Sequence, residues 1–308
     1  MYKNKRIQRV HEAVRGWISG SDKEEEDSEY PSLTRKYYLN EFDLHIAENN
    51  LHLAMVSLHM SDGNRFINRG NLEVLDGRVE KGVGFWTSGL WIEYLDWVWC
   101  WNRFVMPPHL QHTFSPRFGI LHLMQAFLLR QHDIFKGAAL IYSFQDGLEN
   151  FEDWMTQDYF NNTYNNMDVF YLLGKLGMAA EWMPTVQEIE KDLDGHFGEY
   201  ALLLTAQGSD LREAVHSLCE EHLYEHSKKG REDTVWGLFP LRICTFLKLA
   251  GHDVATFSAV HELMSIQASW LGLDKPIQLE DPYAIRALGE LRARSLNIPH
   301  PPELSNGG

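Results

Sequence analysis

The segment FWTSGLWIEYLDWVWCWNRF, residues 85–104, decides the fold class of this chain. It contains five of the ten tryptophans: Trp86, Trp91, Trp97, Trp99 and Trp101. Their spacing puts aromatic rings on every side of a helix, and such a helix is buried on more than one side. Pro107 and Pro108 cannot continue a helix and are expected to end it. The segment therefore predicts a buried helix.

Helical patterns continue on both sides of this segment. Apolar residues recur at a spacing of about 3.6 from Leu33 to Met60, which predicts one long helix. Residues 63–84 are rich in Gly and Asn and predict a loop or hairpin. Further helices are predicted over Ser115–Gln131, Asp133–Phe144, Leu148–Phe160, Asp168–Ala180, Thr185–Thr205, Ser209–Lys228, Thr234–Ala250, Thr256–Trp270 and Pro282–Leu296. The sequence thus predicts an all-α fold of about ten helices in antiparallel hairpins, as a compact or solenoid-like bundle.

Two regions are expected along the chain. Residues 1–30 comprise an amphipathic helix, Val10–Ser19, and an acidic linker, Ser19–Glu29. Residues 31–308 are expected to form a single large helical domain, with a possible subdivision near residues 106–115.

The chain is expected to be cytoplasmic. The N-terminal residues lack the apolar run of a signal peptide, and no window approaches the ~18 apolar residues of a membrane span. The three cysteines, Cys100, Cys219 and Cys244, are an odd number without framework spacing. They are expected to be free buried thiols in a reducing compartment.

The charge balance indicates the kind of partner. Asp and Glu number 43 against 28 Lys and Arg, so the formal net charge is −15 at pH 7. Such a surplus disfavours nucleic acid and anionic membranes and favours a basic protein. Acidic runs occur in residues 146–158, which carry five carboxylates and no Lys or Arg, and in residues 188–199.

These acidic runs are the predicted contact surface for a partner, with Trp154 as an aromatic anchor. The predicted contact residues are Asp146, Glu149, Glu152, Asp153, Trp154, Asp158, Glu188, Glu190, Asp192 and Asp194. Glu213, Glu220, Glu221 and Glu225 add a further acidic helix face.

One catalytic signature is present. His222-Leu-Tyr-Glu225-His226 has the form H-x-x-E-H, in which two histidines on one helix face bind zinc and the glutamate acts as general base. Glu262 or Glu290 is available as a third ligand. His222, however, continues the apolar stripe Leu211, Val215 and Leu218, which favours a packed helix. No metal or cofactor is therefore expected, and a zinc-dependent hydrolase using His222, Glu225 and His226 remains the alternative.

Residues Ser209–Leu271 carry a family resemblance. They contain the acidic helix LREAVHSLCEEHLYEH, the step Leu238-Phe239-Pro240-Leu241, the apolar helix Ile243–Ala250 followed by Gly251, and Ser269-Trp270-Leu271. This region resembles the all-helical immunity proteins of bacterial polymorphic and type VI secretion toxin systems, in particular the immunity protein 49 group.

The resemblance implies a protein without catalytic residues that binds and blocks a cognate toxin. The acidic charge fits a basic toxin such as a nuclease domain, whose nucleic-acid cleft must be positive. We therefore expect an immunity protein, not an enzyme, that occludes the active site of a basic toxin. The alternatives are the zinc-dependent hydrolase and a helical scaffold for some other protein.

Overall fold

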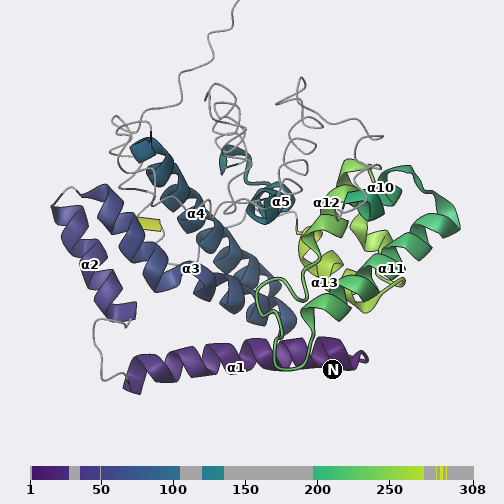
Figure 1. The fold of residues 1–308 in the computed structure, drawn as a ribbon, viewed down its shortest axis with the longest axis horizontal. Coiled ribbons are helices and arrows are strands. Elements are labelled where there is room, and N and C mark those ends of the chain that lie inside the picture. The colour runs from purple at the N-terminus through teal and green to yellow at the C-terminus, as the bar shows by residue number, and fades with distance from the viewer. Residues whose placement is uncertain are drawn as a thin grey trace, which may run out of the picture. The chain divides into compact units, whose positions relative to one another are not determined.

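A computed structural model describes residues 2–27, 35–48, 50–104, 120–134 and 197–273, together with residues 282, 285, 286 and 289. These residues are mostly helical and include no strand, so the all-α prediction is confirmed (Figure 1). The helices are α1 (Lys5–Asp27), α2 (Arg35–Ala47), α3 (Leu51–Leu75), α4 (Val79–Phe104), α5 (Ile120–Leu128), α10 (Phe197–Thr205), α11 (Gly208–His226), α12 (Leu241–Leu249), the 3₁₀ helix η6 (Val254–Phe257) and α13 (Glu262–Leu271).

The chain divides into two compact units. Unit 1 comprises Met1–Gln8 and Gly119–Gly272, and unit 2 comprises Arg9–Phe118 and Leu273–Gly308. The predicted subdivision near residues 106–115 lies outside the described residues. None of the described helices is long and apolar enough to cross a membrane.

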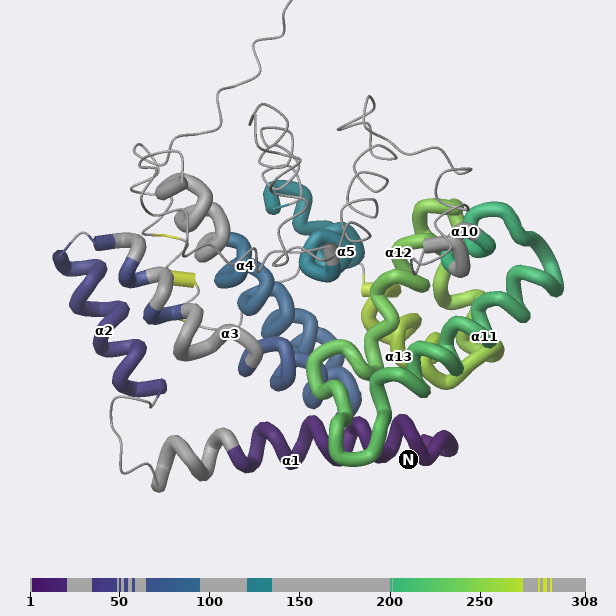
Figure 2. Tube along the Cα trace, in the orientation of Figure 1, coloured from purple at the N-terminus to yellow at the C-terminus, as the bar shows by residue number. Residues whose placement is uncertain are grey.

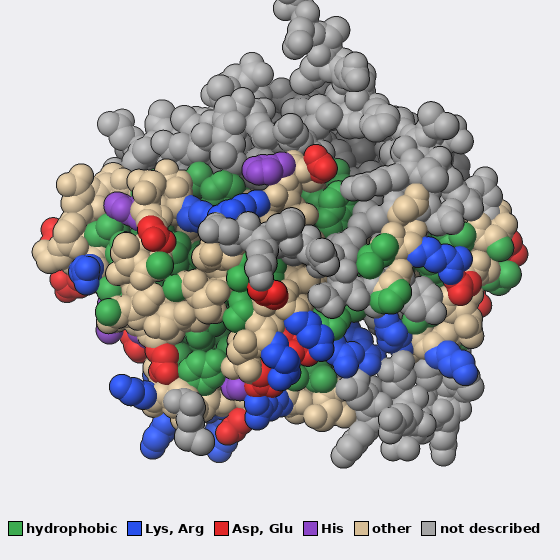
Figure 3. All heavy atoms as spheres, turned by 180° about the vertical axis from the view of Figure 1, so that it is seen from behind, with side chains coloured by type: hydrophobic (Ala, Val, Ile, Leu, Met, Phe, Trp, Pro, Cys, Tyr) green, Lys and Arg blue, Asp and Glu red, His purple; other side chains and the backbone are tan. Residues whose placement is uncertain are grey.

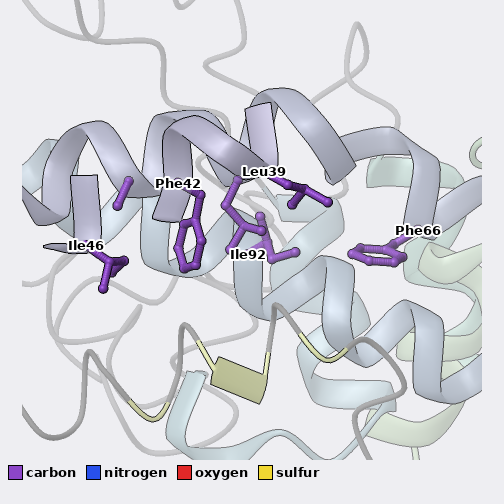
Figure 4. Close-up of a cluster of buried hydrophobic side chains, with 7 residues drawn as sticks. Leu39, Phe42, Ile46, Phe66 and Ile92 are labelled. Atoms are coloured by element: carbon purple, nitrogen blue, oxygen red, sulfur yellow. The ribbon is translucent and has the colours of Figure 1, made fainter. Parts of the chain in front are cut away.

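In unit 2, α3 packs against both α2 and α4 (Figure 2). Buried side chains from all three helices form one hydrophobic cluster (Figure 4). It consists of Leu39, Phe42, Ile46, Ala54, Leu58, Phe66 and Ile92. Phe42 is fully buried, and burying a side chain of this size contributes about 2–3 kcal/mol.

Of the loop or hairpin predicted over residues 63–84, the structure shows the hairpin, and a loop of that length is wrong. α3 continues to Leu75 and α4 begins at Val79, so the two helices form an antiparallel hairpin with a turn of three residues. Gly77 has a φ of 83°, its N–H donates to the Val74 carbonyl, and the Arg78 N–H donates to the Glu73 carbonyl. These two bonds form a Schellman motif, which closes the C-terminus of α3.

Two glycines of this segment, Gly70 and Gly82, serve helix packing instead. A Cβ on Gly82 would lie 2.7 Å from the Gly70 carbonyl oxygen, and a Cβ on Gly70 would lie 2.8 Å from the Gly82 carbonyl oxygen. The backbones of α3 and α4 therefore approach each other directly at this pair. The Trp86 side chain lies against this crossing. Its ring carbon Cδ1 would clash with a Cβ on Gly70, and its Nε1–H donates to Asn71 Oδ1 at 2.8 Å.

Two other helix ends also differ from the prediction. The long helix predicted from Leu33 to Met60 is interrupted, because α2 ends at Ala47 and Asn50 caps a new helix by accepting the Leu53 N–H on its side chain. The acidic linker predicted over Ser19–Glu29 is helical as far as Asp27. Lys and Glu, which make up residues 23–26, are good helix formers and favour the continuation of α1.

In unit 1, α12 packs against α5, α10 and α11. Six of its nine residues are buried: Leu241, Ile243, Cys244, Thr245, Phe246 and Leu247. α12 begins at Leu241 and not at Thr234 as predicted, because residues 234–238 form turns and Pro240 takes the N-cap position. The helix predicted over Thr256–Trp270 is likewise divided into η6 and α13, with His261 capping α13.

Candidate functional site

The predicted partner-contact residues lie outside the described part of the chain. These are Asp146, Glu149, Glu152, Asp153, Trp154, Asp158, Glu188, Glu190, Asp192 and Asp194. The described residues include a further acidic helix that carries histidines, α11. The sequence predicted both ends of α11 to within two residues.

The two histidines of the H-x-x-E-H sequence lie together at the C-terminal end of α11. Their ring centroids are 4.3 Å apart and the ring planes are inclined by 38°. The spacing of four residues produces this contact, because side chains at i and i+4 share one helix face.

Each ring is attached to the turn that follows α11. His222 Nε2–H donates to the Trp236 carbonyl oxygen at 3.1 Å, and His226 Nδ1–H donates to Asp233 Oδ2 at 2.8 Å. A carbonyl and a carboxylate can only accept, so these bonds assign the proton positions on both rings. Asp233 Oδ1 accepts the backbone N–H groups of Val235 and Trp236 at 2.8 and 2.9 Å. Asp233 therefore orders the turn and binds it to α11.

The electrostatics follow from burial and these partners. Burial first, and then the neighbouring His226, lowers the pKa of His222 to about 3, so this ring is neutral at pH 7. Burial alone would raise the pKa of Asp233, but hydrogen bonds from His226 and from the Trp236 and Val235 N–H groups outweigh it and lower that pKa.

The third residue of the signature has a different environment. The Glu225 side chain is 54% exposed, and its Oε2 accepts from Lys228 Nζ at 2.7 Å. Of the two suggested third ligands, Glu262 binds the N-terminus of α1, and Glu290 lies outside the described residues. Within the described ranges, no group of three or more His, Cys, Asp or Glu side chains is arranged to hold a metal ion.

A second polar cluster lies one to two turns earlier on α11. Glu220 Oε1 accepts from His261 Nε2–H at 2.9 Å, while Glu220 Oε2 lies 3.6 Å from the Arg6 guanidinium. That guanidinium also lies over the Tyr224 ring, 5.4 Å from its centroid, and Tyr224 is 55% exposed. His261 Nδ1 accepts the Leu263 N–H, so the same imidazole joins α11 to the start of α13.

Glu262 anchors the first residues of the chain within unit 1. Its two carboxylate oxygens accept the backbone N–H groups of Lys3 and Asn4, each at 2.9 Å. Asn4 in turn accepts the Arg6 N–H on its side chain, which caps α1. A carboxylate at this position also complements the positive end of the α1 dipole.

We expect Glu262→Gln to loosen the N-terminal residues. A glutamine has one acceptor oxygen in place of two, and its NH₂ group faces the second backbone N–H. Amide hydrogen exchange at residues 3 and 4 should accelerate about tenfold, the equivalent of one charged hydrogen bond. Ser265→Ala, a change on the exposed side of the same helix, serves as the control. Unchanged exchange at residues 3 and 4 in Glu262→Gln would show that the carboxylate does not hold them.

The sequence predicted the two histidines and the glutamates of α11 but missed the residues that contact them. Asp233, His261 and Arg6 lie 7, 41 and 214 positions from the α11 residues that they contact. One signal was available for Asp233: an aspartate followed by a turn commonly accepts the N–H groups two and three residues on. Nothing in the local sequence indicates the other two contacts.

Comparisons with protein families, with curated proteins and with solved structures found no match to this chain.

Proposed function

We propose that this chain is an immunity protein that binds a basic toxin and occludes its active site. The observation that carries the proposal is the uneven distribution of charge along the chain. Eleven carboxylates and only three lysines lie between residues 135 and 196, and this segment contains no arginine. More than half of the net charge of −15 thus falls on one fifth of the chain.

The described part of the chain has a more even charge. Lys, Arg, Asp and Glu side chains are interspersed on the face drawn in Figure 3. On α11, two carboxylates have a cation close by: Glu220 has Arg6, and Glu225 has Lys228. Such pairs cancel much of the local field, so the segment 135–196 is the stronger source of long-range attraction.

An acidic field of this kind suits a protein inhibitor of a basic target. It accelerates encounter and selects a partner of opposite charge, while buried aromatic contacts supply most of the affinity. Trp154 lies within the most acidic run, DGLENFEDWMTQD at residues 146–158, and can serve as such a contact. The resemblance of Ser209–Leu271 to the immunity protein 49 group supports the same class.

The direct test asks whether a neighbouring gene encodes a toxin and whether the product of that gene binds this chain. The purified proteins are mixed in 50 mM and in 500 mM salt, and the complex is measured by calorimetry together with toxin activity. We expect a one-to-one complex at low salt, loss of toxin activity and weaker binding at high salt. The absence of any complex at low salt would exclude the proposed function.

We expect neutralisation of residues 146–158 to weaken this complex. The variant replaces all five carboxylates with their amides: Asp146→Asn, Glu149→Gln, Glu152→Gln, Asp153→Asn and Asp158→Asn. Its affinity should fall about 100-fold at low salt, mostly through slower association, and the salt dependence should become shallower.

The control has the same net charge as this variant. It neutralises five exposed carboxylates elsewhere: Glu12, Glu48, Asp133, Asp210 and Glu213. Equal loss of affinity in both variants would mean that net charge alone governs binding. No loss in the first variant would show that residues 146–158 are not the contact.

A further inference from the structure

We draw no further inference here: the strongest candidate, the surface patch of unit 1 where the Arg6 guanidinium and the Lys228 ammonium lie over the exposed Tyr224 ring of α11, carries nothing, because both cations are already paired with carboxylates of α11, Glu220 and Glu225, and nothing in the structure shows what covers the ring.

Discussion

The variant Gly82→Ala is expected to lose about 3 kcal/mol of unfolding free energy, although alanine is a better helix former than glycine by about 1 kcal/mol. The added Cβ would lie 2.6 Å from Val74 Cγ2, 2.7 Å from the Gly70 carbonyl oxygen and 2.9 Å from the Val74 backbone nitrogen. A side-chain methyl can rotate away, but the two backbone atoms belong to α3. The hairpin can accept the methyl only by moving the helices apart, which opens the packing around Trp86.

Guanidinium unfolding followed by tryptophan fluorescence measures this loss, because α4 carries five of the ten tryptophans. Gly16→Ala is the matched control. Gly16 lies within α1, and a Cβ there would meet nothing within 4 Å, so alanine should stabilise the chain by about 0.5–1 kcal/mol. Equal stability of the two variants would show that the close approach of α3 and α4 does not exist.

The second large effect is expected at Gln267, a fully buried side chain on α13. Its Nε2 donates to the Leu238 carbonyl at 2.8 Å and to the Leu263 carbonyl at 3.0 Å, while its Oε1 accepts the Trp270 Nε1–H at 3.0 Å. Gln267→Met keeps the volume but removes all three bonds. The unfolding free energy should fall by about 3 kcal/mol, because a buried polar group that loses its partner costs about 1–3 kcal/mol.

The same substitution at another buried glutamine serves as the control. Gln125 on α5 is 3% exposed, and its Oε1 has no hydrogen-bond partner among the described residues. Gln125→Met removes a polar atom that burial already penalises, so the stability should change little or increase. If Gln267→Met is as stable as Gln125→Met, the hydrogen bonds of Gln267 contribute nothing to stability.

The helical class and the extent of α11 could be predicted because both depend on local pattern. The aromatic run at residues 85–104 forms most of α4, and Ser209–Lys228 differs from α11 by at most two residues at each end. Helical periodicity is visible in a single segment whatever packs against it.

The helix ends were less predictable. α12 starts at Leu241 instead of the predicted Thr234. The Asp233 carboxylate orders a turn before it, and Pro240 takes the N-cap position. At each such position, side-chain hydrogen bonds to the backbone compete with helix formation. Composition alone does not decide which of the two prevails.

The sequence by itself determined the all-α class, the net charge of −15 and the concentration of carboxylates between residues 135 and 196. These are sums and periodicities of individual residues. The tertiary structure decided that Gly70 and Gly82 belong to two helices that meet at these glycines, and that His226 faces Asp233 while Glu220 faces His261 and Arg6. A glycine weakens an isolated helix, and only the approach of a second backbone makes its missing side chain favourable. The partners of a histidine are likewise set by the path of the chain through space.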